Sequence, residues 1–248
     1  MSGHSKWATI KHKKGAADKA RGKLFAKLAR QIEVAARQGG GDIDSNASLR
    51  TMVLKGKAAQ MTKDAIDRAI KRGMGETSGA SYESITYEGY APGGVAVLID
   101  VLTDNRNRAA SDVRSIFSKF GGAMAEPGAV GWQFSRRGVI FIGGSVSEDD
   151  VMVAALEAGA DDVSRDGGLW KVMTDPSIVY EVKDKLDATG LDVQSAESTM
   201  VSSNIIDVSD TDDARNILRI MDALEDNDDV QDVYANFDIA ESIMQEVG

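Results

Sequence analysis

The chain has 248 residues, enough for roughly one to three domains of about 100–150 residues each. Its 42% hydrophobic residues can build packed cores, which excludes global disorder, and the absence of cysteine excludes disulfides, thiolate catalysis and cysteine-based metal sites. No apolar run approaches the roughly 20 residues that span a bilayer, and no secretory signal opens the chain. We therefore expect a cytoplasmic protein without a membrane partner.

The formal net charge of −10 conceals a division along the chain. Residues 1–75 carry 17 basic and 6 acidic side chains, residues 76–135 carry 4 and 7, and residues 136–248 carry 8 and 26. Because charges are screened beyond about 8–10 Å in ordinary salt, the local field decides which partner binds. The basic first segment therefore predicts a polyanionic partner, although the pI of the whole chain is near 4.8.

A basic arm, residues 1–18, should precede a helical module within a first domain at 1–75. The arm shows no clear apolar periodicity, whereas apolar residues then recur at three- and four-residue spacing. Three helices are expected: from about Lys19 to the glycines at 39–41, from the N-cap Ser45 or Asn46 to about Gln60, and from the N-cap Thr62 to Gly73.

Strand patterns replace helical ones after a linker at 74–81. A β-β-α-β series comes first, with strands at 82–89, 95–102 and 130–135 and a helix at about 106–120, but it is incomplete as a sheet domain. Residues 203–240 contain a strand at 204–208, a helix from Thr211 to about Asn227 and a strand at 230–237, which can complete it. We expect 80–136 and 203–240 to form one discontinuous α/β domain.

Residues 137–202 read as a complete unit inserted into that domain. Their pattern is β-α-β-β-α-β, beginning with a strand at 139–142, and this is the ferredoxin-like arrangement. The predicted fold class is therefore α+β multidomain, a helical module followed by two ferredoxin-like-type α/β domains, one inserted in the other. A single extended sheet would use the same elements and is the alternative.

Cations interleaved with an aromatic residue make the arm a candidate nucleic-acid grip, since lysine and arginine contact phosphates and aromatic rings stack on bases. The candidate binding residues are Lys6, Trp7, Lys11, His12, Lys13, Lys14, Lys19, Arg21, Lys23, Lys27 and Arg30, joined by Arg68, Lys71 and Arg72 of the third helix. The alternatives are a solubilising tail, a Trp7 that anchors the arm to the helical module, and an ordinary solvated face on the third helix.

The loop between the strongest strand and the following helix is a candidate anion site. Helix N-termini with adjacent arginines bind anions, and Asn105, Arg106 and Arg108 lie there, although Asn105 is equally suited to plain capping. We find no nucleophile motif, metal cluster or dinucleotide fingerprint, so no catalytic residue, metal or cofactor is expected. Adjacent acidic pairs such as Asp228 and Asp229 fit a solvated surface.

Several longer motifs resemble those of the YebC/PmpR-type proteins across essentially the whole chain. In chain order they are GHSKWA at 3–8, IKHKK at 10–14, RGK at 21–23, MTKDAIDRAIKRG at 61–73, YEGY at 87–90, PGGVA at 92–96, LTDNRNR at 102–108, and GG at 121–122 followed by EPG at 126–128. The departures are Thr62, Ala65 and Ala91, where the family usually has Pro, Asn and Gly. From residue 136 onward the match is looser.

The resemblance implies a bacterial cytoplasmic protein with a helical N-terminal domain and two α/β domains, acting as a DNA-binding transcriptional regulator. A mitochondrial relative resembles a translational activator of cytochrome oxidase, and some members are thought to relieve ribosome stalls at proline-rich stretches. We therefore expect a non-enzymatic nucleic-acid-binding regulator of gene expression. DNA is the first candidate partner and ribosomal RNA on the ribosome the second. A third reading is a protein-interaction module whose acidic α/β domains bind a protein partner.

Overall fold

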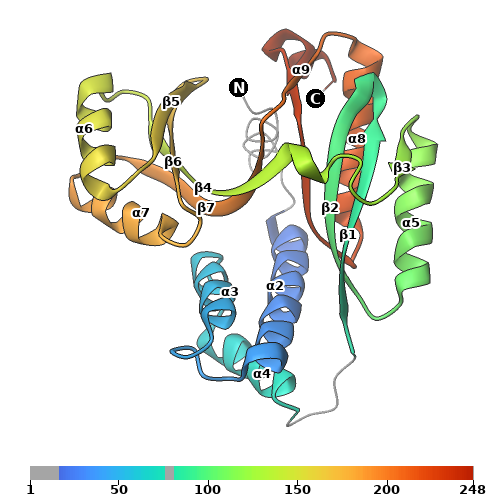
Figure 1. The fold of residues 1–248 in the computed structure, drawn as a ribbon, viewed down its shortest axis with the longest axis horizontal. Helices are drawn as coiled ribbons and strands as arrows, with labels where there is room; N and C mark the ends of the chain where they lie inside the picture. The colour runs from blue at the N-terminus through green and yellow to red at the C-terminus, as the bar shows by residue number, and fades with distance from the viewer. Residues whose placement is uncertain (1–16, 76–80, 248) are drawn as a thin grey trace.

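The computed structural model describes residues 17–75 and 81–247, which form three lobes. The helical module lies below two α/β lobes, and a pair of long strands runs between those two lobes (Figure 1). None of the helices in the described ranges is both long enough and apolar enough to cross a bilayer.

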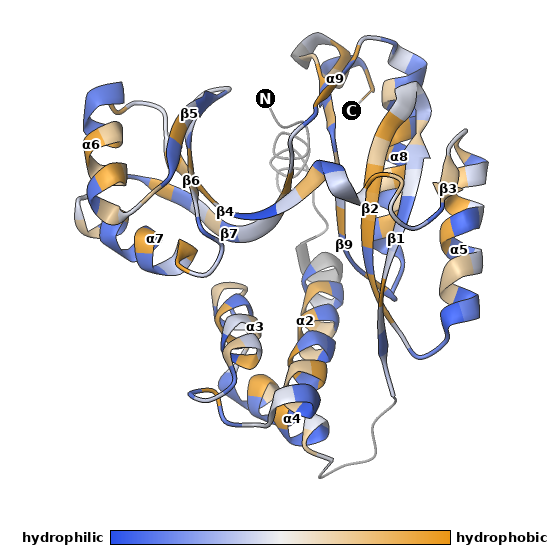
Figure 2. Ribbon diagram, in the orientation of Figure 1, coloured by the Kyte–Doolittle hydropathy of each residue, from blue (hydrophilic) through white to orange (hydrophobic). Residues whose placement is uncertain are grey.

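The helical module consists of α2 (Ala17–Gly39), α3 (Ala47–Ala58) and α4 (Lys63–Gly73). The predicted caps are present: Asn46 Oδ1 accepts the N–H of Leu49, and Thr62 Oγ1 accepts that of Ala65. Each helix mixes apolar and hydrophilic residues (Figure 2). The apolar ones form a core of their own, whose buried members are Leu28, Ile32, Ala35, Ala36, Leu49, Val53, Met61, Ile66 and Ala69.

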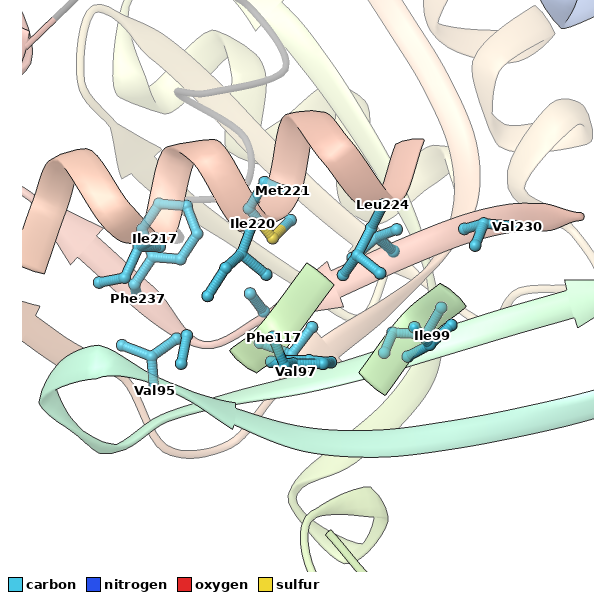
Figure 3. Close-up of a cluster of buried hydrophobic side chains, with 14 of the residues drawn as sticks. Val95, Val97, Ile99, Phe117, Ile217, Ile220, Met221, Leu224, Val230 and Phe237 are labelled. Carbon is cyan, nitrogen blue, oxygen red and sulfur yellow. The ribbon is translucent and has the colours of Figure 1, made fainter. Parts of the chain in front are cut away.

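The first sheet has the strand order β3-β1-β2-β9, and every neighbouring pair is antiparallel. Its strands are β1 (Glu83–Ala91), β2 (Val95–Thr103), β3 (Ala123–Ala125) and β9 (Val230–Ala235), packed against α5 (Arg106–Lys119) and α8 (Thr211–Asp226). A short 3₁₀ turn, η1 (Pro92–Gly94), joins β1 to β2. Figure 3 shows Ile217, Ile220 and Leu224 of α8 directed toward β2, where Val97 and Ile99 are fully buried.

The second sheet has the strand order β5-β6-β4-β7, again antiparallel throughout. It consists of β4 (Phe134–Gly143), β5 (Asp162–Asp166), β6 (Leu169–Thr174) and β7 (Val193–Ser202), with α6 (Glu148–Ala158) and α7 (Val179–Ala188) packed on it. The succession β4-α6-β5-β6-α7-β7 in this order is the ferredoxin-like arrangement. The predicted fold class, a helical module followed by α/β domains with antiparallel sheets, is therefore confirmed.

The C-terminal elements differ in part from the prediction. The strand expected at 230–237 is divided at Asn236 into β9 and β10 (Phe237–Ile239), and β8 (Ile206–Val208) pairs in parallel with β10 in a separate two-stranded sheet. The buried side chain of Asn236 accounts for the division, because its Oδ1 accepts the N–H of Ala96 and its Nδ2 donates to the carbonyl of Asn204. The chain continues into α9 (Glu241–Val247).

The expected pair of strands at 130–135 and 139–142 is one strand, β4, preceded by a 3₁₀ turn, η2 (Gly131–Gln133). Gly138 is not a break, because it pairs with both β6 and β7. A Cβ at this position would collide with Thr174 Oγ1, so the glycine permits a close approach. The predicted boundary between residues 136 and 137 thus falls inside β4, and the partition at 80–136, 137–202 and 203–240 stays a proposal.

Glu88 of β1 fixes the loop that leads into β4. Its carboxylate accepts the backbone N–H groups of Gly128, Val130 and Gly131 at 2.6–2.7 Å. Burial opposes ionisation of this side chain, but the three donors outweigh that cost and lower its pKa below the ordinary value. Trp132, which follows Gly131 in this loop, is 73% exposed.

We expect Glu88→Gln to lower the free energy of unfolding by about 2–4 kcal/mol at pH 7, because an amide cannot satisfy three donors and its NH₂ group meets an N–H. A carboxylate with a lowered folded pKa stabilises above its unfolded pKa, and this contribution is lost as pH falls through the folded value. The difference from wild type should therefore shrink in acid. Urea unfolding at pH 7, 5 and 3.5 measures it, with the exposed Glu83→Gln as control. Equal losses in the two variants would contradict the assignment.

Candidate nucleic-acid interface

The predicted arm lies outside the described residues. This applies to Lys6, Trp7, Lys11, His12, Lys13 and Lys14. Lys19 belongs to α2, but its side chain is not described, whereas Arg21 is exposed near the start of the same helix. The described part of the candidate interface is therefore the surface of the helical module.

Three of the predicted cations, Lys23, Lys27 and Arg30, are spaced four and three residues apart and so share one face of α2. That face meets residues 225–229, the end of α8 and the start of the connection to β9, which we call the acidic turn. Lys23 Nζ donates to the carboxylate of Asp226 at 2.9 Å and to its carbonyl at 3.1 Å, and Lys27 Nζ donates to the carbonyl of Glu225 at 2.8 Å.

Arg30 reaches deepest into this contact. Its Nη1 lies 3.1 Å from the carbonyl of Leu102, 3.0 Å from that of Asp228 and 3.4 Å from the carboxylate of Asp229, and its guanidinium stacks 5.0 Å from the ring centre of Tyr82. Three of the predicted phosphate contacts on α2, namely Lys23, Lys27 and Arg30, are thus bound to the protein itself in this structure.

The cations of α4 divide into two groups. Arg72 donates to Glu33 of α2 at 3.1 Å, and Arg37 approaches the same buried carboxylate at 2.9 Å, so Arg72 ties α4 to α2. Arg68 is exposed and donates to the carbonyl of Asp64 one turn earlier, and Lys71 is exposed. Arg68 and Lys71 therefore present charge to solvent on the helical module.

At the candidate anion site, Arg108 is paired with two carboxylates of the chain itself, those of Asp104 and Asp229. Asn105 caps α5 by accepting the N–H of Arg108, while Arg106 is exposed. The side chain of Arg108 donates to Asp104 at 2.7 Å and to Asp229 at 2.7 Å. Two hydrogen bonds raise the pKa of Arg108, and the one to Asp229 contributes more than the one to Asp104. The hydrogen bond from Arg108 lowers the pKa of Asp104.

Asp229 is the residue that the sequence argument missed. It was expected on a solvated surface, yet it is only 7% exposed and accepts from Thr103 Oγ1 at 2.9 Å as well as from Arg108 and Arg30. No local pattern indicates the burial of Asp229, but α8 has no basic residue in its last turn, which leaves its C-terminal carbonyls open to the cations of α2. Among the described residues, no group of three or more acidic or histidine side chains is placed to hold a metal ion.

Comparison with known proteins places the whole chain among close relatives. Residues 5–76 match the family model for the TACO1/YebC protein N-terminal domain, and residues 82–237 match that for the TACO1/YebC second and third domain. A protein of Rubrobacter xylanophilus is 56% identical over 249 residues, covering 100% of this chain and 99% of that one, and one of Geobacter sp. (strain M21) is 51% identical over 247 residues, covering 100% of both. Both are named "Probable transcriptional regulatory protein".

A solved structure shares the fold. The crystal structure of a conserved hypothetical protein from Aquifex aeolicus has 43% sequence identity and a TM-score of 0.79, covering 94% of this chain and 96% of that one. The three-lobed arrangement is therefore similar to one seen experimentally.

We expect Asp229→Asn to lower the free energy of unfolding by about 2–4 kcal/mol, because it removes the charge that compensates Arg30 and Arg108 at a buried position. Asp228→Asn is the matched control, since Asp228 is exposed and contributes its main-chain carbonyl to Arg30. That variant should change stability by less than about 0.5 kcal/mol. Urea unfolding followed by circular dichroism compares the two, and equal effects would refute the role given to Asp229.

Proposed function

Because the chain belongs to the TACO1/YebC family, we propose that it is a non-enzymatic, nucleic-acid-binding regulator of gene expression, and that duplex DNA is its target. Relatives that cover the full length carry the name "Probable transcriptional regulatory protein", which supports a regulatory role. In this proposal, the protein acts in the cytoplasm, and its basic side chains bind the phosphates of the nucleic acid.

The separation of charge along the chain carries this proposal. Residues 1–75 hold 17 of the 29 basic side chains and 6 of the 39 acidic ones. Phosphate contacts by Lys and Arg supply most of the affinity of non-specific nucleic-acid binding, and a local excess of cations is their usual signature. The exposed positions of Arg21, Arg68 and Lys71 support the helical module as the continuation of the basic arm.

The proposed contact residues fall into two groups. Arg21, Arg68 and Lys71 are open to a ligand on the helical module, and the arm contributes Lys6, Trp7, Lys11, His12, Lys13 and Lys14, with Lys19 between them. By contrast, Lys23, Lys27, Arg30 and Arg72 have partners within the protein. The acidic remainder of the chain repels phosphate, so it should confine nucleic acid to the basic end.

The ribosome is the alternative target, because ribosomal RNA presents a similar phosphate field and some members of the family that the chain resembles are thought to act on the ribosome. Crosslinking in cells, followed by sequencing of the bound DNA and RNA together, separates the two. Recovery of genomic DNA sites supports a transcriptional role. Recovery of ribosomal RNA alone overturns DNA as the target. A protein-interaction module acting through the acidic domains would leave both fractions unenriched.

Binding to duplex DNA should weaken steeply with salt. If about six to eight phosphates are engaged, the slope of log K against log[salt] is about −5 to −7. The double variant Lys13→Gln/Lys14→Gln removes two contacts, so its slope should be less negative by about 1.8, and its affinity should fall for every sequence tested. Fluorescence anisotropy with a labelled 20-base-pair duplex measures both quantities.

The matched control makes the same change outside the proposed interface. Lys183→Gln/Lys185→Gln replaces two lysines of α7 in the second sheet domain and should leave both the slope and the affinity nearly unchanged. A salt-insensitive affinity in the wild-type protein, or equal losses in the two double variants, would refute phosphate binding through the arm.

A further inference from the structure

The contact between α2 and the acidic turn places the cations of the proposed interface on the chain's own anionic surface. Lys23, Lys27 and Arg30 together meet three main-chain carbonyls of residues 225–228 and the carboxylates of Asp226 and Asp229. Oxygen atoms at such distances from lysine and arginine are also what a phosphate backbone offers. The acidic turn therefore occupies the donors that a nucleic acid would need.

The chemistry of a helix end explains why these donors bind there. The last carbonyls of an α-helix have no partner within the helix and carry the negative end of its dipole. The last turn of α8 contains no basic residue, and Lys27 and Lys23 of α2 donate to the carbonyls of Glu225 and Asp226. The helical module thus caps α8 from outside, and the attraction is electrostatic.

Apolar packing contributes little to the contact between α2 and the acidic turn, which we call the joint. The buried core of the helical module contains only residues 28–69, and the other buried clusters of the described chain begin at residue 91, so no buried cluster spans the contact. Close packing of α2 is with α3 and α4. Surfaces held by polar contacts without a shared core are those that move relative to each other.

Two cavities lie within the same joint. One, of about 320 Å³, is lined by Arg30 and Tyr82 together with Arg108 and residues 227–229. The other, of about 240 Å³, lies between α2, α3 and the first sheet. Gln31 Oε1 and Gln231 Oε1 line the second and are buried without a hydrogen-bond partner among the described residues. The joint is therefore incompletely packed and incompletely satisfied.

We infer that the acidic turn is an intramolecular competitor for the nucleic-acid-binding face of α2, so that the structure is the closed state of a two-state device. In the open state the helical module separates from residues 225–229, and Lys23, Lys27 and Arg30 join the phosphate contacts of the arm. This inference rests on the proposed function and adds its regulation.

The strength of the individual contacts suits a switch of this kind. Asp226 is 79% exposed on its side chain, and exposed ion pairs are weak and screened by salt. A polyanion that meets all three cations at once binds the open state better than the closed one, which is the condition for shifting the equilibrium. Destabilising the closed state should therefore raise the affinity for nucleic acid.

Asp226→Lys tests this without removing any cation of α2. The new lysine repels Lys23, while a cation at the C-terminal end of α8 is compatible with the helix dipole. The control is Asp184→Lys on α7, because its side chain is 81% exposed, close to that of Asp226, and the change in net charge is the same. The probe is a labelled 20-base-pair DNA duplex, with a single-stranded RNA of equal length in parallel.

A distance measurement reports the joint independently of affinity. The chain has no native cysteine, so nitroxide labels can be placed at Ala58→Cys on α3 and Ser118→Cys on α5, two exposed sites away from the contact. Double electron–electron resonance is recorded with and without the probe in the full-length wild type and in both lysine variants. Opening appears as a longer or broader distance distribution.

We expect Asp226→Lys to bind about two- to fivefold more tightly than Asp184→Lys, the size of one exposed pair, with a steeper salt slope. Its distances should be shifted before the probe is added, and those of wild type should shift on addition. Binding with unchanged distances and equal affinities of the two variants overturns the competitor role and leaves the proposed function standing. Binding by Asp226→Lys alone supports the inference most directly. Absence of binding in every variant overturns the proposed function and this inference with it.

Discussion

The carboxylate of Asp229 is the point at which the helical module and the first sheet domain are joined. It receives Thr103 from the end of β2, Arg108 from the first turn of α5 and Arg30 from α2. A buried carboxylate must be compensated, and here the partners come from two regions of the chain, α2 and the junction of β2 with α5, both more than 120 residues from Asp229. Asp229, in the turn between α8 and β9, therefore links β2, α5 and the helical module, beside the contacts of Lys23 and Lys27 with the acidic turn.

Between the helical module and the first sheet domain, ion pairs and hydrogen bonds hold the two parts together, whereas apolar packing holds each part together internally. The helical module has its own core, built from α2, α3 and α4, and the two sheet domains have theirs. Between module and body the contacts are ion pairs and hydrogen bonds to carbonyls. The uneven distribution of lysine, arginine and acidic residues therefore has a structural meaning beside its proposed functional one, since it makes a basic lobe and an acidic body attract each other.

Local features of the fold could be predicted from the sequence, but the contact between the helical module and the acidic turn could not. Asn46, Thr62 and Asn105 cap helices as their positions indicated, because capping depends on residues three positions apart. The strands expected at 130–135 and 139–142 are instead one strand, β4, in which Gly138 leaves room for the close approach of Thr174 from the paired strand. Asp229 was missed because its partners lie more than 120 residues away, where no local pattern reaches.

The candidate interface could be predicted from the sequence only in part. The abundance of cations in the first 75 residues is visible in the sequence, but their division into exposed and internally bound ones is not. Lys23 and Arg21 are equally good candidates in the sequence, since both are cations near the start of α2. In the structure, Lys23 contacts the acidic turn, whereas Arg21 is exposed. Only the orientation of α2 on the body separates them.

The pairing of β2 with β9 also constrains the order in which the chain can be assembled during synthesis. Val97 pairs with Ala235, so the first sheet lacks an edge strand until nearly the whole chain has been made. The second sheet needs only residues 134–202 and can close earlier. Domains fold as units as they emerge, and pairings between distant residues form late. The contacts of Asp229 with Arg30, Thr103 and Arg108 must therefore be among the last to form.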